Sequence, residues 1–385
     1  MKKSLVALAA LAAVGAASAQ SSVTLFGVVD AAVSYYESKT TAPNGQSQKQ
    51  SKWALSSGNE SSSRIGVRGV EDLGGGLAAS FWAEGSLDAS TGNLGNSGAT
   101  SVFDRRTTGS LSGPFGELRL GRDYAPTFWN DTIFDPFGTV GVGANALWMV
   151  GHQSLNTAGN PDYKFDYTRN SNSIGYFLPK NLGGLYGQVQ YGFDEYVKIT
   201  NGNVTDNSRA GRYGGGRIGY ANGPLDVAFA YGRKILPGTG TTENYTDTMN
   251  LGASYDFKVV KVMGEYGQIK FKDRTANLAN KVQGGLIGVT APVGPGLIKA
   301  SYAHVQGDWN AANTSKPKID KFALGYVHNL SKRTALYATF AYTKGKNGAG
   351  INAAGASGLG GRLNGGFDTT TGKGYGYDFG LRHSF

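Results

Sequence analysis

The last eleven residues, 375–385, alternate strictly between large, mostly apolar side chains and small or polar ones. One parity holds Tyr375, Tyr377, Phe379, Leu381, His383 and Phe385, and the other holds Gly376, Asp378, Gly380, Arg382 and Ser384. Because successive side chains of a strand point to opposite faces, this pattern predicts a β-strand with one apolar and one polar face. A strand of a soluble protein has the same local pattern, so the rest of the chain must identify the surroundings.

The N-terminus has the three parts of a secretory signal peptide. Lys2 and Lys3 are basic, residues 5–17 are apolar but too few to span a bilayer, and Ala17-Ser18-Ala19 fits a cleavage site. A cytosolic N-terminal helix is the alternative, and the cleavage pattern argues against it. We therefore predict that residues 1–19 are a signal peptide cleaved after Ala19. Losing the two lysines lowers the formal charge from +10 to +8.

Composition excludes several classes of exported protein. No second apolar run reaches the ~18 residues of a transmembrane helix. The chain has no cysteine, so no disulfide stabilises it, while glycine contributes 60 of 385 residues. The mean hydropathy of −0.28 would suit a soluble protein. It also suits a transmembrane β-barrel, in which only alternate residues of each strand face lipid.

Strand-like segments recur along the whole chain, and there are sixteen of them. They are 23–36, 64–70, 77–87, 103–112, 117–122, 165–177, 185–193, 212–220, 225–234, 249–257, 259–269, 282–291, 298–306, 319–328, 335–343 and 375–385. Short connections rich in Gly, Pro and Asn, such as 113–116 and 221–224, alternate with long polar ones, such as 37–52 and 345–374. An even strand number with turns of unequal length is typical of bacterial outer-membrane barrels.

The parity within single strands indicates lipid on one face and water on the other. Ile65 and Val67 share one face, whereas Arg64 and Arg68 share the opposite face. A charge that faces lipid at mid-depth costs roughly 2–4 kcal/mol, so these arginines must face a wet interior. Backbone groups in a bilayer must all be paired, which strands achieve only in a closed barrel. We predict an all-β, 16-stranded antiparallel transmembrane β-barrel, wide enough for an aqueous channel, in residues 20–385.

Several motifs occur in an order that resembles the general Gram-negative porins, especially the beta-proteobacterial type. They are Ser22-Val-Thr-Leu-Phe-Gly-Val-Val-Asp30, Ser63-Arg-Ile-Gly-Val-Arg-Gly-Val-Glu-Asp-Leu-Gly-Gly-Gly76, Gly113-Pro-Phe-Gly-Glu-Leu-Arg-Leu-Gly-Arg-Asp-Tyr124 and the terminal Phe385. The resemblance implies an outer-membrane homotrimer in which each barrel is a water-filled channel for passive diffusion of small hydrophilic solutes and ions. It also implies contact with outer-membrane lipid and lipopolysaccharide, and assembly by the barrel-assembly machinery with Phe385 as a signal.

The resemblance further implies that the third loop folds into the barrel and narrows it. The long interruption at about 123–162 is the candidate, and it is unusually apolar, with Phe128, Trp129, Phe134 and Phe137 among its residues. So apolar a loop is expected to pack against the inner wall rather than lie in water. A mobile external loop is the alternative.

Motif by motif, the resemblance places a cluster of wall arginines on Arg64, Arg105 and Arg169. It places the facing loop carboxylates on Asp131 and Asp135. Strand parity agrees for Arg64 and leaves Arg169 inside. In the fourth strand the more polar parity belongs instead to Arg106, so Arg105 and Arg106 both remain candidates. Fixed charge at the narrowest point is what makes a pore selective. The alternative is a structural role, in which the arginines attach the third loop to the wall.

Other basic residues have the parity of the interior and would extend a basic path, or are ordinary solvated wall charges. They are Arg68, Arg217, Lys299 and Arg382. The formal charge of +8 and the three candidate arginines of the cluster predict a preference for small anionic or neutral solutes. Acids with the parity of the interior, Glu84, Asp226, Asp256 and Asp378, oppose it.

Other classes of function find little support in the chain. The four histidines are scattered, without metal spacing or a neighbouring nucleophile, and no nucleotide-binding loop is present. We therefore expect no enzyme, no cofactor or metal, and no nucleic-acid partner. Two alternatives to a general diffusion channel remain open. One is a substrate-specific channel for organic acids or phosphate, and the other is a plugged structural or adhesion barrel.

Overall fold

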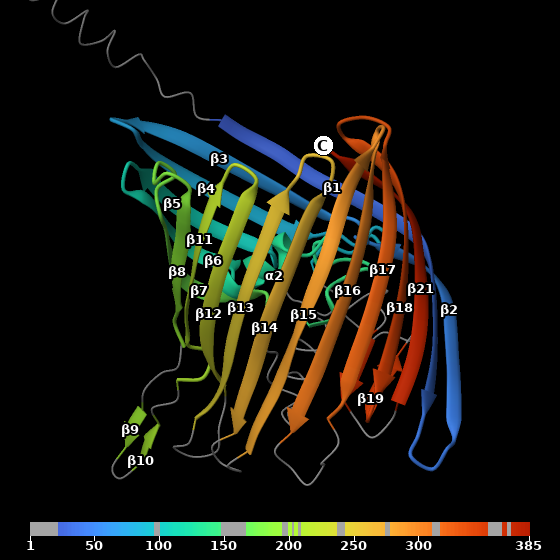
Figure 1. Ribbon diagram of the computed structural model, residues 1–385. Helices are drawn as coiled ribbons and strands as arrows, with labels where there is room; N and C mark the ends of the chain where they lie inside the picture. Colours follow the sequence, from blue (N-terminus) through green and yellow to red (C-terminus); the bar gives the residue numbers. More distant parts are fainter. Residues whose placement is uncertain are drawn as a thin grey trace, which may run out of the picture.

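The computed structural model describes residues 22–95, 101–147, 167–194, 199–201, 204–206, 209–236, 243–273, 278–309, 316–352, 364–367 and 371–385. These residues form one large antiparallel sheet that curls into a barrel (Figure 1). No helix among them is long and apolar enough to cross a membrane. The predicted signal peptide, 1–19, and its cleavage site lie outside the described residues.

The sheet contains seventeen strands, and each pairs with the next strand of the sheet along the chain except that β2 and β3 both pair with β1. Their bounds are β1 (Ser22–Thr41), β2 (Ser47–Ser57), β3 (Arg64–Gly74), β4 (Leu77–Ser86), β5 (Arg106–Gly113), β6 (Gly116–Tyr124), β7 (Arg169–Phe177), β8 (Leu185–Gly192), β11 (Tyr213–Asn222), β12 (Leu225–Leu236), β13 (Asn244–Asp256), β14 (Lys261–Asp273), β15 (Leu278–Val293), β16 (Gly296–Trp309), β17 (Lys318–Asn329), β18 (Thr334–Lys346) and β21 (Thr371–Ser384).

Strands β2 and β3 occupy one position in the wall. The C-terminal half of β1 pairs with β2 and its first residues pair with β3, while residues 58–63 interrupt the ladder between them. The barrel therefore has sixteen strand positions, which confirms the predicted architecture.

The first and last strands close the barrel. β1 pairs with β21 from Val28↔Ser384 to Thr41↔Thr371. The ladder ends on Phe385, whose backbone N–H and C=O exchange two 3.1 Å hydrogen bonds with Gly27. Closure leaves no open sheet edge, which is the condition for strands to cross a bilayer.

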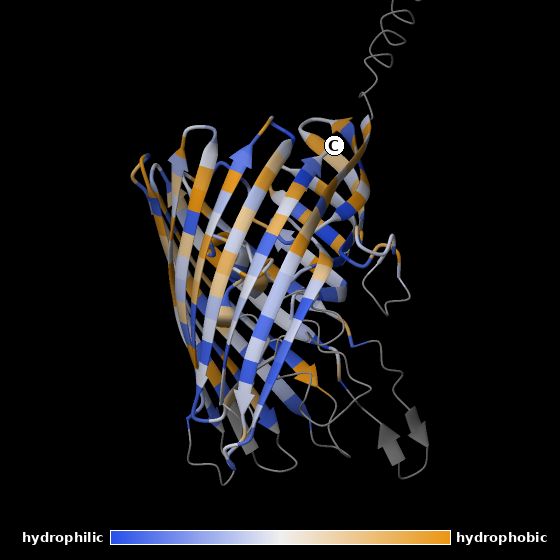
Figure 2. Cartoon of the chain, turned by 90° about the vertical axis from the view of Figure 1, so that its right-hand side faces the viewer, coloured by the Kyte–Doolittle hydropathy of each residue, from blue (hydrophilic) through white to orange (hydrophobic). Residues whose placement is uncertain are grey.

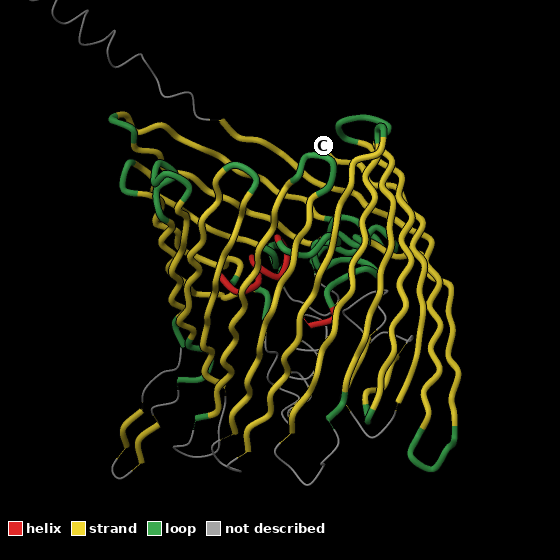
Figure 3. The backbone as a smooth tube through the Cα atoms, viewed as in Figure 1, coloured by secondary structure: helices red, strands yellow, loops and turns green. Residues whose placement is uncertain are grey.

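The two ends of the barrel differ in their connections (Figure 3). Short turns such as 75–76, 114–115, 223–224 and 294–295 lie at the end that holds the C-terminus. The long connections lie at the other end and include two short hairpins, β9 (Ile199–Asn201) with β10 (Val204–Asp206) and β19 (Ala349–Asn352) with β20 (Asn364–Phe367). Long connections on one side only are the expected asymmetry of an outer-membrane barrel, with the long ones outside the cell.

Hydrophobic and hydrophilic residues alternate along the strands, as the sequence predicts (Figure 2). In β13, Leu251 and Tyr255 are exposed on the outside while Asn250 and Ser254 are buried inside. Within the apolar band the strands thus present an apolar outer face and a more polar inner face, and charged inner residues avoid the cost of facing lipid.

Strand boundaries differ from the expectation mainly at the outer end. Residues 37–52 were expected to form a loop, but β1 and β2 extend through them to Thr41 and from Ser47 as a paired hairpin. This stretch is polar on both faces because it rises beyond the apolar band, so no apolar alternation marks it. The predicted strand 103–112 begins later, at Arg106.

Candidate pore constriction

The third loop lies inside the barrel. Its first part is a short helix, α2 (Pro126–Ile133), which begins with a proline whose missing N–H costs nothing at that position (Figure 1). Asn130 donates to Ala228 O and Asn250 Oδ1, both at 3.1 Å. Asn250 in turn donates to Thr127 O at 2.8 Å. Side-chain amides therefore attach the helix to β12 and β13.

After α2 the loop packs on glycines of the inner wall. Phe134 lies against Gly252, Pro136 against Gly288, and Phe137 against Gly325. A Cβ added at Gly325 would lie 2.9 Å from Phe137 Cε1, closer than packed side chains approach. Leu147 and Val142 use Gly267 and Gly376 in the same way. We call Gly252, Gly267, Gly288, Gly325 and Gly376 the wall glycines. Because they have no side chains, they leave the space that the apolar loop fills.

The far part of the loop reaches the closing strand. The backbone N–H of Val142 donates to Asp378 Oδ2 at 2.9 Å, and Lys321 Nζ donates to Ala144 O at 2.7 Å. The loop therefore crosses the bore from β11–β14 to β17 and β21. This agrees with the predicted inward-folded loop for residues 123–147, while the rest of the predicted range lies outside the described residues.

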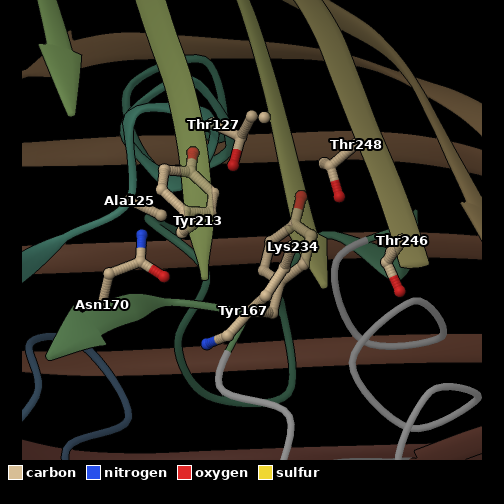
Figure 4. A pocket seen from close by; sticks show the side chains of 9 residues that line it. Ala125, Thr127, Tyr167, Asn170, Tyr213, Lys234, Thr246 and Thr248 are labelled. Carbon is tan, nitrogen blue, oxygen red and sulfur yellow. The ribbon is translucent and has the colours of Figure 1, made fainter. Parts of the chain in front are cut away.

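A small pocket marks where the start of the loop meets the wall (Figure 4). It is lined by Ala125, Thr127, Tyr167, Asn170, Tyr213, Gly232, Lys234, Thr246 and Thr248. Tyr167 also donates a 2.6 Å hydrogen bond to Asp131 Oδ2. The pocket is thus part of the attachment of the loop.

Three of the predicted arginines converge on Glu84 and Tyr124, beside the point where the loop leaves β6. Arg105 donates from Nε to Glu84 Oε1 at 2.6 Å and from Nη2 to the Tyr124 hydroxyl at 2.8 Å. Arg169 lies over the Tyr124 ring at 4.6 Å and donates to the same hydroxyl at 3.2 Å. Arg64 lies 4.0 Å from Glu84, and 29% of its side chain is exposed, against 12% for Arg105. Arg64, Arg105 and Arg169 are the arginine cluster.

Arg105 and Arg106 both contact residues on the inner face of β4. Arg106 begins β5, shares the parity of the inward Thr108, and lies over the Trp82 ring at 4.6 Å. Arg105 precedes the strand, so strict alternation does not apply to it, and it contacts Glu84 of the same β4 face. Parity favours Arg106 and the resemblance favours Arg105. Both side chains can contact the inner face of β4 because only Arg106 belongs to the regular strand β5.

The two loop carboxylates do not face the arginine cluster. Asp131 is fully buried and accepts hydrogen bonds from Tyr167 and from Asn250, the latter at 2.9 Å. Asp135 accepts from the backbone N–H groups of Phe137, Thr139 and Asn145, each at 2.9 Å. The expectation that these acids face the arginines is therefore wrong. They hold the fold of the loop and its contact with the wall, because a buried carboxylate needs such donors.

Burial also shifts the acidity of these two groups. It raises the pKa of Asp131 to about 6, although hydrogen bonds from Glu265, Tyr167 and Asn250 partly oppose the rise. Burial likewise raises the pKa of Asp135, against the effect of its three backbone donors.

The residues proposed for a basic path have different surroundings. Arg217 donates to Asn130 Oδ1 at 2.5 Å and to the Tyr186 hydroxyl at 3.0 Å, so it helps hold α2. Lys299 is buried and donates to Glu60 at 2.6 Å. Arg68 is exposed and lies over the rings of Phe26 and Trp82, at 5.3 and 5.1 Å. Arg382 lies on β21, in register with Asp30. Of these four, Arg68 has the surroundings of an open wall charge.

Two residues of the site were not singled out from the sequence. Tyr124 ends a motif that carried the family resemblance, but nothing in its spacing indicated that its hydroxyl would accept from two arginines. Glu60 lies in the interruption between β2 and β3, 239 residues from its partner Lys299, and no local pattern marks such a pair.

A closed sixteen-position barrel, with a loop folded into its bore and arginines on the facing wall, defines a channel of the outer membrane. A family model described as Gram-negative porin matches residues 6–348, and the chain belongs to this family of non-enzymatic channels. It is an outer-membrane porin.

Known relatives cover all or most of the chain. Outer membrane porin protein 32 of Delftia acidovorans is 41% identical over 387 residues, covering 100% of both chains. An outer membrane porin of Bordetella pertussis is 30% identical, covering 89% of this chain and 94% of its own. The solved anion-selective porin from Comamonas acidovorans is 37% identical with a TM-score of 0.76, covering 95% of this chain and 100% of that one.

Proposed function

We propose that this porin is an anion-preferring channel for passive diffusion, and that Arg64, Arg105, Arg106 and Arg169 give it that preference. The observation that carries the proposal is the arginine cluster, three guanidinium groups gathered around Glu84 and Tyr124. Guanidinium groups stay charged at any working pH. A narrow bore with low-dielectric walls increases the potential that a passing ion experiences.

The position of the loop supports the same sign of selectivity. Asp131 and Asp135 are buried in the loop attachment, so they do not neutralise the arginines from across the bore. The wall carboxylate that does touch the cluster, Glu84, is only 5% exposed and is engaged by Arg105. The Comamonas relative is an anion-selective porin, which points in the same direction.

Liposome swelling tests the proposal with uncharged and anionic solutes of matched size. We expect neutral sugars and small monocarboxylates to enter, with the anions entering faster than cations of the same size. A channel that admits only dicarboxylates or phosphate, and excludes small sugars, would establish the substrate-specific alternative instead. No swelling with any solute would establish the plugged barrel.

We further propose that the mature chain begins at Gln20, that Phe385 is its assembly signal and that the porin works as a homotrimer. The Gly27–Phe385 backbone pair supports a special role for the last residue, because it completes the seam between the first and last strands. Exposed apolar residues on β1 and β3–β5, such as Val23, Leu25, Val70 and Phe81, offer a surface for a second copy. Native mass spectrometry of the purified protein measures both the mature mass and the number of copies.

A further inference from the structure

A second stretch of chain, besides the third loop, lies on the inner side of the wall. It is the interruption between β2 and β3, Gly58-Asn-Glu-Ser-Ser-Ser63, and we call it the inward segment. Its Glu60 accepts from Lys299 of β16, with Nζ and Oε1 2.6 Å apart. Strands β21, β18 and β17 separate β1 from β16. At about 4.8 Å per strand, the ion pair joins the segment beside β1 to a strand roughly 19 Å away along the wall.

The Glu60–Lys299 pair lies inside the barrel. Lys299 shares the parity of the buried Ser301, whereas Ile298 and Tyr302 are exposed on the outer face of β16. The side chains of Lys299 and Glu60 are only 9% and 7% exposed. Because water screens so dry a pair only weakly, its attraction is stronger than that of a solvated surface pair.

The inward segment is also attached to β1. The backbone N–H groups of Glu60 and Ser61 both donate to Asp30 Oδ2, at 2.8 and 2.7 Å. The Asn59 side chain donates to Ser34 Oγ at 3.1 Å. Strand β1 therefore holds the backbone of the segment, and the ion pair with β16 holds the Glu60 side chain that extends from it.

Arg64 of the arginine cluster directly follows the inward segment and is bound by it. Its Nη1 donates to Ser62 O at 2.8 Å and to Ser61 Oγ at 3.3 Å. Within the described part of the chain, these are the two hydrogen bonds of the Arg64 guanidinium, and its contact with Glu84 is long, at 4.0 Å. The direction of this guanidinium therefore depends on where the inward segment lies.

We infer that Glu60 and Lys299 are positioning residues for the anion preference of the channel. Their ion pair holds the inward segment, and the segment in turn orients Arg64. This inference rests on the proposed function, which assigns Arg64 to the preference. The two charges of the pair largely cancel for a passing ion, so the pair acts through Arg64 rather than by its own charge.

A variant that removes both charges separates these two ways of acting. E60A/K299A leaves the net charge unchanged but releases the inward segment, and E60K/K299E restores an ion pair of the opposite direction. R233A/D247A is the matched control, because it removes an ion pair on the outer face without changing the net charge. The measurement is the ratio of anion to cation permeability of the folded porin in a planar bilayer.

We expect the permeability ratio to fall in E60A/K299A and to stay at the wild-type value in E60K/K299E and in the control. A guanidinium that moves from about 5 to about 10 Å from a passing anion loses half of its interaction energy, which corresponds to about a twofold fall. A wild-type ratio in E60A/K299A, or an equally low ratio in E60K/K299E, would overturn the inference.

The same change in an R64Q background shows whether the effect passes through Arg64. We expect R64Q alone to lower the ratio and R64Q/E60A/K299A to lower it no further. An equal additional fall in the R64Q background would overturn the inference while leaving the proposed function intact. An unchanged ratio in R64Q alone would instead overturn the assignment of Arg64 in the proposed function, and this inference with it.

A reversible crosslink gives a second test within one folded protein. The chain has no cysteine, so E60C/K299C introduces its only thiols, and a short bis-methanethiosulfonate can join them. We expect the crosslinked porin to keep the wild-type ratio and reduction of the crosslink to lower it about as far as E60A/K299A. Failure of the two thiols to crosslink in the folded porin, measured by mass, or a ratio that reduction leaves unchanged, would overturn the inference.

Discussion

Arg105 and Glu84 form the closest ion pair of the arginine cluster, with Nε and Oε1 2.6 Å apart. The carboxylate is 5% exposed, and Arg105 also donates to Tyr124. The acid therefore fixes the direction of a guanidinium that would otherwise be repelled by Arg64 nearby. Glu84 lowers the positive charge of the cluster but fixes the orientation of Arg105, and mutation of Glu84 can test both effects.

Arg64→Gln and Arg169→Gln should each lower the preference for anions without affecting assembly. A unit charge about 5 Å from a passing anion contributes about 0.8 kcal/mol in a water-like dielectric, or roughly a fourfold change in occupancy before screening. The ratio of anion to cation permeability, measured in planar bilayers, should fall in both variants. Arg233→Gln on the outer face is the control, because Arg233 pairs with Asp247 away from the bore. Unchanged permeability ratios in both inner variants would show that the arginine cluster does not set the ion preference.

Glu84→Gln should have the opposite effect on selectivity. It removes the carboxylate that touches Arg105 and Arg64, so the cluster gains net positive charge. We expect stronger anion preference with noisier single-channel currents, because Arg105 loses its partner and becomes mobile. A weaker anion preference in this variant would mean that Glu84 matters mainly for placing Arg105.

Gly252→Ala should destabilise the contact between the third loop and the wall, because a Cβ there would overlap the Phe134 ring. Overpacking of this kind costs about 1–3 kcal/mol. The thermal unfolding midpoint should fall and the single-channel conductance should change as the loop moves. Gly109→Ala is the control, since a Cβ at Gly109 meets nothing within 4 Å. If both alanine variants behave like the wild type, the wall glycines do not position the loop.

Acid should strengthen the attachment of the loop through Asp131. Burial raises the pKa of Asp131 from an ordinary 3.8 to about 6, so the folded protein binds this proton more tightly than the unfolded chain. The resulting stabilisation is fully present below about pH 3.8 and is lost as the pH rises through about 6. Thermal unfolding midpoints measured from pH 4 to 8 should therefore decline, and Asp131→Asn should reduce the decline.

Asp88→Asn is the control for that pH series. Asp88 lies in the connection after β4, where hydrogen bonds from Ser90 outweigh partial burial and lower its pKa. Its contribution has the opposite sign, because stability is then lost as the pH falls. The decline from pH 4 to 8 should persist in this variant, and an equal loss of the decline in both variants would contradict the role of Asp131.

Deleting Phe385 should reduce assembly far more than conduction. The deletion removes the two hydrogen bonds to Gly27 and leaves the seam between β1 and β21 one residue short. We expect a low yield of folded porin in the outer membrane, measured by the gel shift between heated and unheated samples, with normal conductance in the molecules that fold. Wild-type yield would show that the last residue is not needed for assembly.

The periodic part of this structure was predictable from the sequence. Alternation alone places Ile65 and Arg64 on opposite faces, because a strand leaves no other choice. The same rule fails at Lys39 and Lys49, where the hairpin of β1 and β2 is polar on both faces, so its strands are invisible to a hydrophobic pattern. It also fails at Arg105, which precedes its strand.

Contacts across the bore were harder to predict. Asp131 follows Asn130 on α2. The rotation of this helix about its own axis decides whether the Asp131 side chain faces the arginines or the wall at Asn250. Such an orientation depends on how the loop packs against β13, more than a hundred residues away in the sequence. The resemblance to a family transferred a role to Asp131 that the packing of this loop does not allow.

The zero-current potential of the purified porin in a planar bilayer under a KCl gradient measures which ion passes the arginine cluster more readily. The arginine cluster predicts stepwise conductance and a potential whose sign corresponds to chloride as the more permeant ion. A potential of the opposite sign would contradict the proposed anion preference, because potassium would then pass more readily than chloride beside Arg64, Arg105 and Arg169.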